Sequence, residues 1–142
     1  MIGLFFEDVI VDKLDETFYL NWLGNTCLSE GKVLKEVNII FSSDEYLLAK
    51  NIEFLQHDYY TDVITFDYCV GNNVLGDLFV SVERVAENAE DNNVEFIDEL
   101  NRVIIHGVLH LCGYKDKLDE DAAVMRSKED LYLSKIVPRG TM

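Results

Sequence analysis

The segment 62–82 constrains the fold of this 142-residue chain more than any other part of the sequence. Residues 62–68 alternate in polarity, turn-forming residues (Gly-Asn-Asn) follow at 71–73, and residues 74–82 form a second apolar stretch that Gly76 interrupts. Two such stretches joined by glycine and asparagine predict a β-hairpin. The middle of the chain is therefore expected to supply two antiparallel strands.

Strands and helices are expected on both sides of this hairpin. Short apolar or β-branched runs predict strands at 2–6 and 33–41, and Asn92 with Glu95 resembles a capping box before a helix. The order of elements predicts an α/β (α+β) class, with one small mixed four-stranded sheet, helices around it and a single domain over residues 1–142. Helices are expected at 13–29, 44–56, 83–91, 96–111 and 118–134, and a flexible tail at 136–142.

Composition narrows the class of protein. Hydrophobic residues make up 49% of the chain, which excludes a disordered acidic polymer despite a net charge of −15. Residues 1–100 hold 5 basic and 21 acidic side chains (−16), whereas residues 101–142 hold 7 basic and 6 acidic ones (+1). The acidic balance argues against a generally basic surface that coats nucleic acid, and it leaves room for a local basic patch.

The sequence also carries signals about location. No apolar run is long enough to span a membrane, and the first eleven residues have the character of a strand and no signal-peptide pattern. Three cysteines without CxxC spacing indicate free thiols in a reducing cytoplasm. A cytoplasmic protein without membrane contact is expected.

Two histidines, His106 and His110, stand four residues apart in the helix expected at 96–111. Residues at that spacing lie about 40° apart around a helix and about 6 Å apart along it, so both imidazoles can bind one metal ion. Gly113 allows the chain to reverse after the helix, and Asp116 then offers a carboxylate. Two histidines, one aspartate and a water would form an open, catalytic zinc site.

Other interpretations of these residues remain open. Paired histidines on an amphipathic helix are often surface residues without a metal, and Asp116 can be a solvated loop acid. Zinc peptidases with paired helical histidines place a glutamate directly after the first one as general base, whereas Gly107 stands there in this chain. The general base is therefore unassigned.

The sequence HGVLHLCGYKD at residues 106–116 resembles the YbeY-type endoribonucleases, bacterial rRNA maturation factors. Two upstream stretches carry the same resemblance: TDVITF at 61–66 is similar to the family's TDVLSF strand, and LGDLFVS at 75–81 is similar to its LGDIxIS strand. The resemblance implies a mixed sheet with helices, a zinc ion, cleavage of single-stranded RNA, and a role in small-subunit rRNA processing.

Two positions depart from the family pattern. The family usually has a third histidine ligand in GYDH, and Asp116 occupies that position here. A carboxylate also binds zinc, but its charge makes a bound water less acidic, and two histidines with one carboxylate suit Fe²⁺ as well. The family has an arginine three residues before Asp58, where this chain has Leu55, so phosphate contact must come from another cation.

Two acidic residues are expected either to support the metal site or to serve the fold. Asp77 follows a strand glycine, and it either makes a structural hydrogen bond or orients a ligand histidine. Glu99 lies two helical turns before His106 and on the same face, or it pairs with Arg102.

Thr65, Lys115 and Lys117 are expected near the substrate. Thr65 either bonds within the sheet or lines the cleft, and the two lysines either are solvated or contact phosphate. Because the segment 101–142 is nearly neutral, we expect weak, salt-sensitive RNA binding on that face and dependence on a partner such as the small ribosomal subunit or an assembly factor.

The sequence thus predicts a zinc-dependent endoribonuclease of rRNA maturation, in which His106, His110 and Asp116 bind the metal and the two histidines act through it. DNA is not an expected substrate. Two other classes stay open: a metallohydrolase of the peptidase type, and a non-catalytic ribosome-assembly module with a structural metal.

Overall fold

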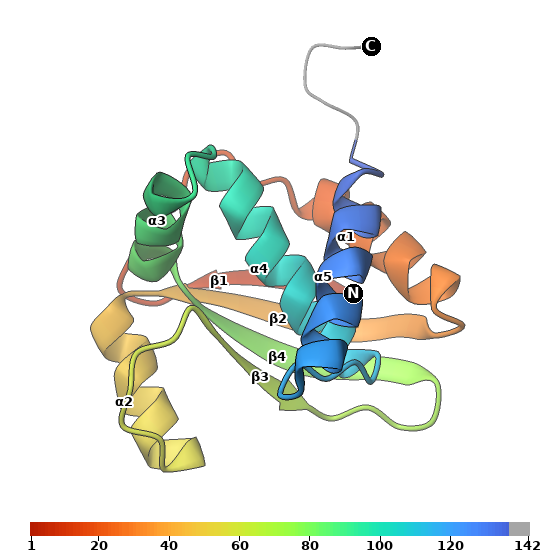
Figure 1. Ribbon diagram of the computed structural model, residues 1–142, viewed down its shortest axis with the longest axis horizontal. Coiled ribbons are helices and arrows are strands. Elements are labelled where there is room, and N and C mark those ends of the chain that lie inside the picture. The colour runs from red at the N-terminus through yellow and green to blue at the C-terminus, as the bar shows by residue number, and fades with distance from the viewer. Residues whose placement is uncertain (137–142) are drawn as a thin grey trace.

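The computed structural model describes residues 1–136, which fold around a four-stranded mixed sheet (Figure 1). The strand order is β1-β2-β4-β3, with β1, β2 and β4 parallel and β3 antiparallel to β4. The predicted hairpin, the mixed sheet and the α/β class are confirmed. The expected tail lies outside the described residues from 137 onward. The strands are β1 (Ile2–Phe6), β2 (Val33–Ser42), β3 (Val63–Asp67) and β4 (Asn73–Ser81).

Helices cover the two faces of the sheet unequally. α1, α4 and α5 lie on one face, where the main hydrophobic core forms, and α2 lies on the other side against β3 and β4 (Figure 1). α3 packs mainly on α4. The helices are α1 (Glu16–Ser29), α2 (Asp44–Leu55), α3 (Val82–Asp91), α4 (Phe96–Leu111) and α5 (Asp119–Leu133).

One helix start and one capping motif differ clearly from the sequence-based expectation. α1 begins at Glu16 and not at residue 13, because Lys13 has a left-handed backbone (φ 64°) and the Asp15 carboxylate caps the helix. The capping box is wrong: Asn92 ends α3, and Glu95 is the residue before α4 but makes no side-chain capping bond.

Close packing of α4 on β4 fixes the position of the histidine pair. A Cβ on Gly107 would lie 2.8 Å from Leu78 Cδ2, and a Cβ on Gly76 would lie 2.7 Å from Leu111 Cδ2. A glycine on each element therefore permits the close approach. His106 and His110 lie beside this contact, half-buried and facing the region over β3.

The expected free thiols are confirmed for Cys27, Cys69 and Cys112. Within residues 1–136 no helix combines the length and the apolar character needed to cross a membrane.

Candidate metal centre

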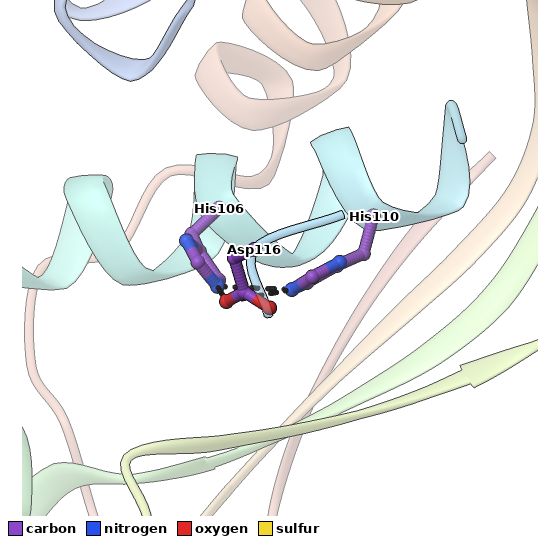
Figure 2. A group of neighbouring side chains, drawn as sticks. All are labelled: His106, His110 and Asp116. Carbon is purple, nitrogen blue, oxygen red and sulfur yellow. Dashed lines mark hydrogen bonds and ion pairs between the residues drawn. The ribbon is translucent and has the colours of Figure 1, made fainter. Parts of the chain in front are cut away.

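Three side chains converge at the end of α4 (Figure 2). His106 and His110 come from successive turns of α4, and Asp116 comes from the segment that reverses after the helix, where Gly113 has a φ of 106°. The reversal occurs at a glycine because few other residues adopt this backbone conformation. The predicted third partner therefore reaches the histidine pair.

The spacing of the three donor atoms fits a metal ion. His106 Nε2 lies 3.0 Å from His110 Nε2 and 3.1 Å from Asp116 Oδ2. His110 Nε2 lies 3.4 Å from Asp116 Oδ2. Ligand atoms around tetrahedral zinc lie about 3.3–3.6 Å apart, and neighbouring ligands of a six-coordinate ion lie about 3.0 Å apart. The arrangement suits a divalent ion and leaves its coordination number open.

The other ring nitrogens show which atoms carry the protons. His110 Nδ1 lies 2.9 Å from the Tyr114 carbonyl oxygen, which can only accept a hydrogen bond, and His106 Nδ1 lies 2.7 Å from Glu129 Oε2. Each Nδ1 therefore donates, and a neutral ring directs the lone pair of its Nε2 inward. Two lone pairs and the carboxylate oxygen of Asp116 repel one another unless a metal ion lies between them or one Nε2 is protonated, and with a metal ion the three atoms form a ligand set.

Glu129 is the partner that sequence reasoning missed. Its side chain is buried on α5 and also accepts from Arg102 at 2.8 Å, and Arg102 pairs with Asp130 at 2.7 Å. Met125, Glu129 and Tyr132 form the buried stripe of α5. An acid within an i, i+4, i+7 stripe is the signal that could have identified Glu129.

Electrostatics couples these groups. Burial alone would lower the pKa of His106, but the hydrogen bond to Glu129 and the charges of Asp116 and Asp62 outweigh it and raise the pKa. Burial would raise the pKa of Glu129, and its bonds to His106 and Arg102 lower it instead. A proton therefore competes with a cation for His106.

The three donors open onto a cleft of about 490 Å³ between α4, β3 and the segment 56–62. Burial raises the pKa of Asp62 in this cleft, and the charge of His106 partly opposes the effect. Among the described residues that line the cleft, Lys117 is the one lysine or arginine. The lining is Asn51, Leu55, His57, Tyr59, Thr61, Asp62, Val63, Ile64, Thr65, Asp67, His106, His110, Asp116 and Lys117.

The supporting residues divide into two groups. Thr65 and Lys117 line the cleft with the donors. Asp77 accepts a hydrogen bond from Asn38 Nδ2 at 3.1 Å. This bond corresponds to the first of the two roles expected for Asp77, a structural hydrogen bond within the sheet. Its neighbours Gly76 and Leu78 face α4, so the Asp77 side chain lies on the opposite face of the sheet.

Glu99 and Lys115 lie outside the cleft lining. Glu99 is buried in the first half of α4, where burial raises its pKa. Of the two alternatives for Glu99, a close ion pair with Arg102 is not formed, because the ion pairs of Arg102 go to α5. The charge of Arg102 still partly opposes the effect of burial on the pKa of Glu99. Lys115 is exposed.

Comparison with known proteins identifies the family. The family model described as Endoribonuclease YbeY matches residues 10–137. The chain belongs to this family. Endoribonuclease YbeY of Flavobacterium psychrophilum is 56% identical over 116 residues, which cover 82% of this chain and 83% of the relative. Its namesake from Flavobacterium johnsoniae is 57% identical, covering 82% and 84%.

Similarity to a solved structure supports the fold as well. The solution structure of TM1509 from Thermotoga maritima matches with a TM-score of 0.63 and 29% identity, and the match covers 100% of both chains. The expected resemblance to YbeY-type proteins is therefore confirmed along nearly the whole chain, beyond the three stretches that first indicated it.

Family membership places the chain among endoribonucleases, which are hydrolases that cut RNA internally. The two positions that depart from the family pattern can also be placed in the structure. Leu55 lines the cleft at the position where the family resemblance has an arginine, and Asp116 takes part in the donor triad. The peptidase alternative loses support, because the matching family is one of endoribonucleases and Gly107 stands where zinc peptidases place their general base.

Proposed function

We propose that this chain is a zinc-dependent endoribonuclease that cuts single-stranded RNA during maturation of the small ribosomal subunit. The observation that carries the proposal is the convergence of His106 Nε2, His110 Nε2 and Asp116 Oδ2 in an open cleft. Family membership supports RNA as the substrate. The donor set supports a divalent metal, which bound there would polarise a phosphoryl oxygen or provide a hydroxide at neutral pH.

The protein side chains have separate tasks in this mechanism. His106 and His110 keep their Nε2 atoms aimed into the cleft, because Glu129 and the Tyr114 carbonyl hold their Nδ1 atoms. Lys117 faces the same cleft and can contact a phosphate. Asp62 is a partly buried carboxylate in the cleft wall, and we assign it the role of proton acceptor.

Zinc is the proposed ion, and Fe²⁺ is the competing one, because two histidines and a carboxylate suit both. Metal analysis of protein purified without chelator decides between them. One zinc per chain supports the proposal, and stoichiometric iron without zinc would replace zinc in it.

Cleavage of an end-labelled single-stranded RNA tests the function itself. Chelator should abolish cleavage, added zinc should restore it, and a folded His110→Ala variant should stay inactive in both conditions. A variant that cuts as fast as the wild type, or activity that chelator leaves untouched, would overturn the mechanism. If the wild-type protein binds zinc and never cuts RNA, the non-catalytic assembly module becomes the better explanation.

Substitution of Asp62 tests the proton acceptor separately. Asp62→Asn should lower the cleavage rate by about 10²–10⁴-fold, which is the usual contribution of general acid–base catalysis, while zinc content stays at the wild-type level. Asp67→Asn is a matched control, because Asp67 lines the same cleft but is exposed and accepts the Cys69 backbone N–H at 2.8 Å. Equal rates for the two variants would remove Asp62 from the mechanism.

The proposed setting is the cytoplasm, with the small ribosomal subunit or an assembly factor as partner and with DNA outside the substrate range. The strongly acidic segment 1–100 supports this view, because such a surface does not hold free RNA by charge alone. Cosedimentation of the protein with small subunits, compared with large subunits, tests the partner.

A further inference from the structure

The segment 56–62 forms one wall of the cleft, and hydrogen bonds anchor its backbone at several points. The buried Asn51 donates from Nδ2 to the Tyr59 carbonyl oxygen at 2.9 Å, and the Asp62 carbonyl accepts from the Ser81 N–H at 2.9 Å. At its start, Gln56 ends α2 in a left-handed conformation (φ 56°). Tyr59 and Asp62 are therefore presented from anchored points of the backbone.

Aromatic residues on this wall fall into two kinds. Tyr60 is engaged by the fold: its hydroxyl donates to Glu45 at 2.5 Å, and its ring lies 5.2 Å from the guanidinium of Arg84. His57 and Tyr59 instead stack on each other, with ring centroids 5.2 Å apart and planes 19° apart. Tyr59 is 55% exposed, and both rings line the cleft that holds the metal donors.

The charges of the cleft make such a pair useful for holding RNA. Three carboxylates line the cleft (Asp62, Asp67 and Asp116), and Lys117 is the lysine or arginine among its described lining residues. Attraction of phosphate by side-chain charge is therefore weak. Stacking of a base on an aromatic ring needs no net charge and tolerates any base, because every base has a π face.

We propose that His57 and Tyr59 form a stacking site for one unpaired base of a single-stranded RNA, next to the triad of His106, His110 and Asp116. This inference rests on the proposed function and adds a binding determinant to it. A base within a duplex is already stacked on its neighbours, so the site favours unpaired strands. His57 and Tyr59 act as positioning residues, because they place the strand without touching the reacting atoms.

A fluorescent base analogue tests the proposal by a readout that does not depend on cleavage. Short single-stranded RNAs carry 2-aminopurine, whose emission falls when it stacks, at successive positions, and chelator-treated protein keeps the RNA intact. Wild-type protein should quench one position strongly. Tyr59→Ala should abolish that quenching and weaken RNA binding about 5- to 150-fold, which corresponds to the loss of one stacked base.

Two variants serve as controls. Tyr59→Phe keeps the ring and removes only the hydroxyl, which lies 3.0 Å from His57 Nδ1, so its quenching and affinity should stay close to wild type. Tyr68→Ala removes an equally exposed tyrosine (57%) that is not among the cleft residues. This variant should keep the quenching and the RNA affinity of the wild type.

The outcomes separate the two proposals. If Tyr59→Ala quenches and binds like Tyr68→Ala while the wild type cuts RNA, the stacking site is wrong and the endoribonuclease proposal stands. Equal binding of single- and double-stranded RNA by the wild type would also overturn the stacking site. A wild-type protein that neither binds nor cuts RNA overturns both proposals.

Discussion

At the scale of single residues, the chemistry of this site depends on atoms outside the donor triad. Glu129 fixes the tautomer of His106 from one side, and the Tyr114 carbonyl does the same for His110. Partners of this kind orient metal-ligating histidines and raise their basicity. The charge on Glu129 is itself stabilised by Arg102 at 2.8 Å. The triad is therefore one part of a network that reaches from α4 into α5.

Removal of the charge on Glu129 should weaken metal binding. Glu129→Gln keeps the size of the side chain and an oxygen that can accept from His106 Nδ1, so the loss should be limited to about 10- to 100-fold in zinc affinity. Competition with a chromophoric chelator measures it. Asp130→Asn removes the other ion-pair partner of Arg102 without touching His106, and its affinity should match the wild type. Equal affinities for all three proteins would contradict the role of Glu129.

At the scale of the elements, the distance between α4 and β4 depends on Gly107. A Cβ at this position would lie 2.8 Å from Leu78 Cδ2, and Leu78 is fully buried, so the neighbouring side chain has little freedom to move away. Overpacking of this kind usually costs about 1–3 kcal/mol. Gly24 in α1 is the contrast, because nothing lies within 4 Å of a Cβ built there.

Alanine at the two helical glycines should therefore have opposite effects. Gly107→Ala should lower the free energy of unfolding by about 1–3 kcal/mol, whereas Gly24→Ala should raise it by up to about 1 kcal/mol because alanine favours the helix. Urea unfolding followed by circular dichroism measures both. A neutral or stabilising Gly107→Ala would show that α4 and β4 can separate at no cost.

Local sequence patterns predicted the helices and strands better than they predicted which of these elements pack against one another. The hairpin of β3 and β4 and the helix of the histidines followed from alternation, turn residues and helical spacing, which are properties of neighbouring residues. The start of α1 and the false capping box depended on single backbone conformations. Glu129 depended on the packing of α5 against α4, and no pattern within α5 says which helix it will contact.

The candidate site was predictable to a similar extent. His106 and His110 follow from i, i+4 spacing on one helix, and Asp116 follows from the glycine that reverses the chain. The wall formed by residues 56–62 could not be predicted in this way, because it reaches the histidines only through pairing of β3 with β4. Tyr59 therefore became a candidate only in the folded structure.

At the scale of the whole molecule, Glu30 joins three separate parts of the chain. Its carboxylate follows α1 and accepts hydrogen bonds from Tyr114 after α4 and from Tyr132 on α5, and Lys128 lies 3.3 Å away. Burial alone would raise the pKa of Glu30, but these donors outweigh it and lower the pKa below its ordinary value. The ionised form is therefore favoured by folding.

This shift sets a pH dependence of stability. A lowered folded pKa contributes stability that is fully present above the unfolded value of 4.5 and is lost as the pH falls through the folded pKa. Glu30→Gln should be less stable than wild type at pH 7, and the difference should shrink below pH 4.5. Urea unfolding at a series of pH values measures it. Glu90→Gln, with the same charge change on an exposed residue of α3, should show little difference.

The uneven charge of the molecule predicts how RNA binding responds to salt. The binding constant for single-stranded RNA falls as the salt concentration rises. In a plot of log K against log salt, each phosphate contact makes the slope steeper by about 0.7. Lys117→Ala should therefore weaken binding and make that slope shallower by about 0.7. Lys13 is an exposed lysine near the start of α1 and outside the cleft, so Lys13→Ala should leave both the affinity and the salt slope unchanged. Tight binding that salt does not affect would contradict this distribution of charge.

The most direct test of the central claim is a titration of metal-free protein with zinc while cleavage of a single-stranded RNA is followed. If His106, His110 and Asp116 hold one catalytic ion, the cleavage rate should rise in proportion to bound zinc and level off at one ion per chain. Cleavage at the full rate by metal-free protein would contradict the claim.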